Sequence, residues 1–123
     1  DYIPALWCAA HILIRPRLAP STLEEWVRLG QAMQNVWLTA TKVGLHLQPE
    51  MTPVIFRWYA RANRRFSADL EITSKADKLS REFELLVNAN ETDAFGFFGR
   101  VGVSKVPRSR SVRLKLEDLL QSS

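Results

Sequence analysis

The sequence predicts an α+β fold in which one long central helix packs on a small mixed sheet. Residues 22–44 carry a continuous helical pattern of apolar residues, two shorter helical patterns follow, and only two stretches have the character of strands. A chain of 123 residues with 46% hydrophobic residues can build one core. Because a two-stranded sheet is only marginally stable, further strands must come from another chain or from polypeptide upstream of Asp1. Residues 1–123 are therefore a single domain or the C-terminal half of one.

The first strand is expected at residues 5–14, a continuous apolar run with β-branched residues near its end. Such a run is typical of a strand that is buried on both faces at the centre of a sheet. A helix through its alanines is an alternative, but Pro4 and Pro16 at the two ends favour a short extended segment. Two side chains inside the run, Cys8 and His11, are then expected to be core residues without a chemical role.

The central helix follows a capping signal, because Ser21 precedes Glu24 by three residues and such a pair forms a capping box. Gly44 lies where a helix C-cap is expected. Apolar or small residues recur three or four apart along one stripe: Leu23, Trp26, Gly30, Met33, Trp37, Ala40 or Thr41, and Gly44. A second stripe lies beside the first: Val27, Gln34, Leu38 and Leu45. A helix that is apolar around most of its circumference is normally covered on several sides, and Gly30 indicates close backbone packing there.

Residues 45–51 are expected to form a loop, since the long helix has ended and Pro49 resists starting another. A short helix should follow at residues 53–63, with Thr52 as N-cap and Pro53 at the first helical position. Arginines occupy its expected outer face and its end: Arg57, Arg61, Arg64 and Arg65. The usual meaning of such a set is a solvated basic face.

A third helix is expected at residues 74–86. Four residues share its apolar side: Ala76, Leu79, Phe83 and Leu86. The second strand is expected at residues 94–103, where glycines indicate bends or close approach of another backbone. A basic loop or extended arm should occupy residues 104–113, and a short helical turn should occupy residues 116–120.

Composition and motifs exclude several classes of function. The net charge of +4 does not by itself argue for nucleic acid. No apolar run reaches the roughly 18 residues that a membrane-spanning helix needs. Cys8 is the only cysteine, which excludes an intrachain disulfide and favours a reducing, cytoplasmic setting. His11 and His46 lack neighbouring ligands and no serine or cysteine carries a nucleophile motif, so no catalytic or metal-binding residue is assigned.

Two stretches keep a chemical interpretation. Arg108 and Arg110 alternate with Ser109 and Ser111, so an extended chain places both arginines on one side. Arginine forks suit bidentate phosphate contacts, and serine hydroxyls add donors. The other stretch, residues 48–51, leaves the end of the buried helix. A solvated basic tail and an ordinary connector are the alternative interpretations of these two stretches.

A set of spacings in residues 30–45 has a counterpart in a known family. The chain has Gly30, Gln34, Asn35, Leu38, Ala40 and then Gly44-Leu45. This pattern resembles the central helix of the flavin-dependent nitroreductase family. Residues 98–102 and then 107–110 resemble that family's late strand and its arginine-containing C-terminal segment. With residues 47–50 and 53–56 included, the chain is similar to nitroreductase-like domains fused to adenylating enzymes of the ubiquitin-activating type.

The resemblance covers nearly the whole chain in order and implies a nitroreductase-like α+β fold. It also implies an obligate homodimer through the helix at residues 30–45, with FMN at the subunit interface. One side of this helix would meet its own fold and another side the partner subunit. The implied reaction is two-electron transfer from NAD(P)H through the flavin to an acceptor, and its chemistry belongs to the cofactor.

The resemblance assigns cofactor-binding residues in two segments. The family's phosphate-binding segment is matched by Arg108, Ser109 and Arg110. The family's loop beside the flavin ring, which acts largely through backbone groups, is matched by Gln48, Pro49 and Glu50. The family also holds FMN through an N-terminal arginine–serine–arginine segment, which has no counterpart here, so the likeness is to the C-terminal half of the domain.

Three classes of function are consistent with these patterns. The first is an oxidoreductase half-domain that completes its FMN site with an upstream segment. The second is a non-catalytic dimerisation or interaction module that keeps the fold without a working flavin site. The third, a nucleic-acid binder that uses the arginines, is disfavoured because no aromatic-interleaved or helix-turn-helix pattern accompanies them.

Overall fold

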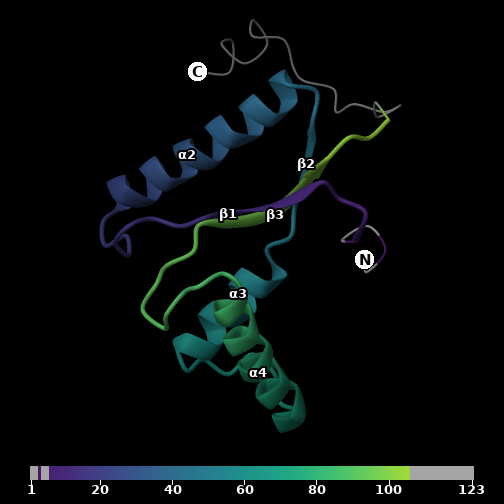
Figure 1. Cartoon of the computed structure of the whole chain (residues 1–123). Coiled ribbons are helices and arrows are strands. Elements are labelled where there is room, and N and C mark those ends of the chain that lie inside the picture. The colour runs from purple at the N-terminus through teal and green to yellow at the C-terminus, as the bar shows by residue number, and fades with distance from the viewer. Residues whose placement is uncertain (1–2, 4–5, 106–123) are drawn as a thin grey trace, which may run out of the picture.

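The computed structural model describes residue 3 and residues 6–105, which form a small α+β fold of three helices and a three-stranded antiparallel sheet. The elements in chain order are β1 (Ala10–Ile14), α2 (Leu23–Lys42), β2 (His46–Pro49), α3 (Thr52–Arg61), α4 (Leu70–Leu86) and β3 (Phe97–Gly102). Figure 1 shows α2 crossing one side of the sheet, with α3 and α4 together on the other side. The α+β class is confirmed, whereas the expected mixed sheet is antiparallel.

β3 is the central strand, and the order of the sheet is β1-β3-β2. The register places His11 of β1 and Gln48 of β2 on either side of Arg100 in β3. The prediction that β1 is a central strand buried on both faces is wrong, because β1 is an edge strand with exposed and half-buried residues. A continuous apolar run does not by itself distinguish these cases, since its neighbours depend on the rest of the chain.

The segment after α2 forms β2 instead of the expected loop. Gly44 has a φ of +79°, which turns the chain out of the helix and directly into the sheet. Pro49 is tolerated in this strand because antiparallel pairing alternates along the chain. The Glu50 N–H donates to the Phe98 carbonyl at 2.9 Å, so the Pro49 backbone faces the outer edge and needs no N–H there.

The capping box of α2 lies one residue later than the sequence predicts. The Thr22 hydroxyl accepts from the Glu25 N–H at 3.3 Å, and the Glu25 carboxylate accepts from the Thr22 N–H at 3.1 Å. The Ser21 N–H donates to the same carboxylate at 2.7 Å. These hydrogen bonds, the one from the Ser21 backbone first, lower the pKa of the Glu25 carboxyl.

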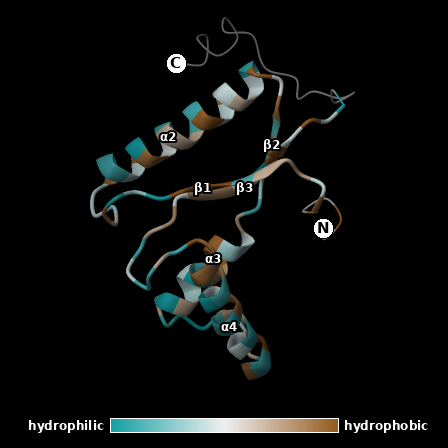
Figure 2. Ribbon diagram, viewed as in Figure 1, coloured by the Kyte–Doolittle hydropathy of each residue, from teal (hydrophilic) through white to brown (hydrophobic). Residues whose placement is uncertain are grey.

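The core lies between α2 and one face of the sheet. Its buried residues are Ala40, Leu47, Phe97 and Val101. Figure 2 shows hydrophobic residues recurring along the whole of α2, although one side of the helix alone covers this core. A Cβ at Gly30 would meet no atom within 4 Å, so the close contact expected at this glycine is absent among the described residues.

α3 and α4 form a helical hairpin. α4 starts at Leu70, earlier than expected, because the Asp69 carboxylate accepts from the Glu71 N–H at 2.8 Å and caps the helix. Thr52 is the first residue of α3 and not its N-cap, which is Met51 without a side-chain hydrogen bond. No helix in the described part of the chain is both long and apolar enough to cross a membrane.

Arg57 does not lie on a solvated face, because it is only 5% exposed. Its Nε donates to Glu84 Oε1 at 2.7 Å, its Nη1 donates to the Asp93 carbonyl at 2.7 Å, and its guanidinium lies 4.2 Å from the centre of the Phe95 ring. Arg61 also donates to Glu84, through Nε at 2.8 Å. This network joins the helical hairpin to the segment before β3. Arg64 and Arg65 are exposed, as the sequence predicts.

Candidate functional site

Three of the six residues that the resemblance assigns to cofactor binding lie within the described part of the chain. Gln48 and Pro49 belong to β2, and Glu50 follows directly. Arg108, Ser109 and Arg110 lie outside the described residues. The site can therefore be built from the residues around β2, on the sheet face opposite α2.

Arg100 of β3 holds both polar side chains of the β2 segment. Its Nη1 donates to Glu50 Oε1 at 2.7 Å, and its Nη2 donates to Gln48 Oε1 at 2.7 Å. Gln48 lies directly opposite Arg100 in the register, so this is a cross-strand pair extended by one carboxylate. The side chain of Arg100 is only 11% exposed, and the charge-assisted hydrogen bonds compensate its burial.

His11 adds the third strand to this cluster. Its Nε2 lies 3.3 Å from Glu50 Oε2, and its ring stacks on Phe98 with the centroids 5.5 Å apart. The side chain is 39% exposed, so the expectation of a core histidine is wrong. Cys8, also expected in the core, is half-buried, and its Sγ lies 3.7 Å from His11 Nδ1. Three strands thus bring imidazole, carboxylate, guanidinium and amide groups together.

A cavity of about 490 Å³ with both polar and apolar lining adjoins the cluster at the C-terminal end of β3. Its lining includes Trp7, Cys8, His46, Gln48, Arg100 and Ser104. His46 Nδ1 is buried and has no hydrogen-bond partner among the described residues. An orphaned ring nitrogen of this kind is energetically costly, so it is a feature that a bound polar group would satisfy.

The outer edge of β2 is open in the described part of the sheet. Since Gln48 and Glu50 turn their backbone groups toward β3, the alternation turns those of Leu47 and Pro49 outward. An open edge of this kind offers a backbone donor and acceptors to a ligand or to another strand.

Sequence reasoning missed Arg100 and His11 as members of the site. A signal existed for Arg100, because it is the only charged residue between Ala94 and Val103. His11 left no local signal, since its partner Glu50 is distant in sequence and the two meet only through the sheet. Among the described residues, no group of three or more histidines, cysteines or carboxylates could hold a metal ion.

Comparison of the chain with known protein families, with curated proteins and with solved structures found no match.

Proposed function

We propose that this chain is the C-terminal half of an FMN-dependent NAD(P)H oxidoreductase domain of the nitroreductase type. The position of the segment at residues 48–50 carries the proposal. It follows α2 after a five-residue link and lies on a sheet edge that is open among the described residues, and Arg100 fixes the side chains of Gln48 and Glu50. The resemblance assigns to the side of the flavin ring a segment that follows the central helix and acts largely through backbone groups, and an open edge supports this role by leaving such groups available.

The described residues fit one end of FMN. The polar edge of the flavin ring presents donors and acceptors, and the orphaned His46 Nδ1, the Gln48 amide and the outward backbone of Leu47 are complementary groups. Both terminal nitrogens of Arg100 are already bonded within the cluster, so the phosphate needs other cations.

The phosphate is assigned by the resemblance to Arg108, Ser109 and Arg110. When bound, FMN supplies two-electron transfer from NAD(P)H to an acceptor. In this proposal the residues of the chain anchor the phosphate and position the ring.

A homodimer through the helix at residues 30–45 belongs to the same proposal. Several apolar side chains of α2 and its C-cap are exposed in the single chain, among them Trp37 at 36%, Leu38 at 59% and the C-cap Val43 at 64%. An apolar surface of this kind on one long helix is characteristic of an interface. The partner subunit and the upstream segment would cover it.

The first prediction concerns FMN affinity. The Arg108→Ala/Arg110→Ala double variant should bind FMN at least about 100-fold more weakly, because each charge-assisted phosphate contact contributes about 1.5–3 kcal/mol. The measurement is quenching of FMN fluorescence on titration with the longest available polypeptide that contains this chain and its upstream segment.

The matched control is the Arg17→Ala/Arg81→Ala double variant, which removes two exposed arginines elsewhere and keeps the same net charge as the test variant. Its FMN affinity should equal that of the wild type at fixed ionic strength. Absence of FMN binding by the wild type, or equal affinity in the two double variants, would sink the proposal.

The second prediction uses Gly30 to test the dimer. Because a Cβ there meets no atom within 4 Å, the Gly30→Ala variant should stabilise the monomer by up to about 1 kcal/mol through helix propensity. The same methyl group should weaken a dimer in which a partner helix packs closely on Gly30. Sedimentation equilibrium and urea unfolding at low protein concentration measure the two effects. A dimer as tight as the wild type would exclude close packing at this glycine.

The second candidate function, a non-catalytic interaction module, is favoured by the internal pairing of the cluster. Arg100, Glu50, Gln48 and His11 already bond one another, which is how a structural polar network is built. This candidate predicts a stable dimer that carries no flavin. A yellow preparation with NAD(P)H-dependent turnover would rule it out.

A further inference from the structure

α4 carries an exposed apolar ridge that no other part of the described residues covers. Ile72, Leu79 and Leu86 are seven residues apart, so they lie along one face of the helix. Their exposed fractions are 49%, 63% and 81%. The buried residues of α4 form a separate row beside the ridge, at Ala76, Ser80 and Glu84, and this row faces α3.

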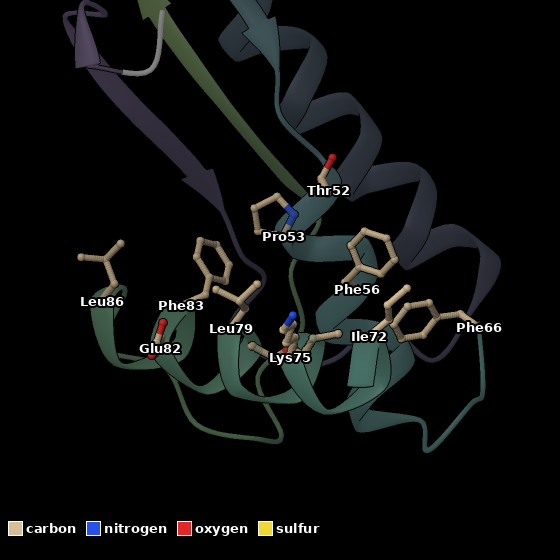
Figure 3. A pocket seen from close by; sticks show the side chains of 12 residues that line it. Thr52, Pro53, Phe56, Phe66, Ile72, Lys75, Leu79, Glu82, Phe83 and Leu86 are labelled. Carbon is tan, nitrogen blue, oxygen red and sulfur yellow. The ribbon is translucent and has the colours of Figure 1, made fainter. Parts of the chain in front are cut away.

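The ridge borders an apolar groove of about 510 Å³ between α4 and α3. Figure 3 shows Ile72, Leu79 and Leu86 in a row along α4, with Pro53 and Phe56 on the opposite wall. An apolar groove flanked by a helix with apolar residues at heptad spacing is the kind of surface that accepts the apolar face of another helix.

The ridge is its own complement under a two-fold axis. Ile72 precedes Leu79 by seven residues and Leu86 follows it by seven, so reversal of the helix about Leu79 exchanges the two ends. Lys75 precedes Leu79 by four residues and Glu82 follows it by three, and both line the rim of the groove. The same reversal therefore places Lys75 of each copy beside Glu82 of the other copy. Along the helix axis the two positions differ by about one residue rise of 1.5 Å.

We propose that two copies of the chain associate through an antiparallel pairing of α4, with the two-fold axis beside Leu79. Leu79 packs on the partner's Leu79, and Ile72 packs on the partner's Leu86. Lys75 exchanges its exposed contact with Glu71 of its own chain for the partner's Glu82, and the symmetric pair forms as well. The two α3–α4 hairpins then close each other's grooves as an antiparallel four-helix packing.

This interface does not rest on the proposed flavin function. α4 and α2 lie on different sides of the sheet, so pairing through α4 leaves the α2 surface accessible (Figure 1). The charge complementarity selects a second copy over an uncharged apolar ligand, which would gain nothing from Lys75 and Glu82 at the rim.

The first test is cross-linking at the axis. In a Cys8→Ser background the only cysteine is the one introduced by Leu79→Cys, and a residue on the axis meets its own copy. Mild oxidation should convert most of this variant to a disulfide-linked dimer on a non-reducing gel. The control, Leu85→Cys in the same background, is 81% exposed on the same helix but off the ridge, and should form no disulfide-linked dimer on the gel. Equal cross-linking of the two variants, or none, overturns the proposal.

The second test reverses the charges one at a time. Lys75→Glu and Glu82→Lys should each raise the dimer dissociation constant about tenfold or more, because each places like charges opposite at both symmetric contacts. Mixing the two variants should restore association, since a heterodimer then has attractive pairs at both contacts. Sedimentation velocity measures all three samples. A mixture that associates no better than its components overturns the pairing and leaves the groove to another occupant.

Discussion

The Glu84→Gln variant is expected to lose about 3–5 kcal/mol of its free energy of unfolding. Glu84 is 5% exposed and is the carboxylate that Arg57 and Arg61 share. Removing its charge leaves the buried Arg57 guanidinium with carbonyl partners alone, and an uncompensated buried charge costs this much. Because domains are typically stable by only about 5–15 kcal/mol, the helical hairpin should open at much lower urea concentration.

Urea unfolding followed by circular dichroism measures this effect. The matched control is Glu71→Gln, which makes the same change on the same helix at a side chain that is 73% exposed and whose ion-pair partner among the described residues is Lys75. The control should shift the free energy of unfolding by less than about 0.5 kcal/mol. Equal stability of the two variants would show that the network around Arg57 contributes little.

The pH dependence of the free energy of unfolding, compared between the wild type and Glu84→Gln, gives an independent check. The hydrogen bonds from Arg61, followed by the one from Arg57, lower the pKa of the Glu84 carboxyl in the folded chain. A lowered folded pKa means that the contribution is complete above the unfolded pKa of about 4.3 and is lost as the pH falls through the folded value. The stability difference between wild type and Glu84→Gln should therefore shrink in that acidic range and stay constant at neutral pH.

The same network shows where sequence reasoning stops. The helical spacing around Arg57 predicts α3, but a repeated arginine pattern has the same spacing whether it faces water or a buried carboxylate. The deciding partner, Glu84, is 27 residues away and belongs to another helix. Periodicity reports which residues share a face, and only the packing of two elements reports what that face meets.

The candidate site also has one part that the sequence predicts and another that only the packed structure reveals. Gln48, Pro49 and Glu50 were found through their resemblance to a family, and the structure gathers Gln48 and Glu50 on Arg100. β2 itself was missed because four residues with a proline carry no periodic signal, and its pairing is set by a strand that lies some 50 residues later. Long, strongly periodic helices are therefore predictable, while a short strand and a cross-strand cluster are consequences of the assembled sheet.

The Gly99→Ala variant is expected to lose about 3 kcal/mol of stability and to disrupt the candidate site at the same time. Gly99 lies in the central strand, opposite Pro49 in the register. A Cβ at this position would lie 2.7 Å from the Gln48 carbonyl oxygen and 2.9 Å from the Phe97 ring. The oxygen belongs to backbone, so the clash can be relieved only by moving β2 away from β3, which is a severe form of overpacking.

Gly102→Ala in the same strand is the control, since its nearest neighbour would be the Ala9 nitrogen at 3.4 Å, an almost ordinary contact. Amide hydrogen exchange separates a local effect from a global one, because the Glu50 N–H donates to the Phe98 carbonyl across the same strand pair. Gly99→Ala should accelerate exchange at Glu50, while Gly102→Ala leaves it unchanged. If Gly99→Ala retains slow exchange and wild-type stability, the close approach of β2 to β3 is not what holds Gln48 and Glu50 against Arg100. The position of the proposed flavin segment would then need another cause.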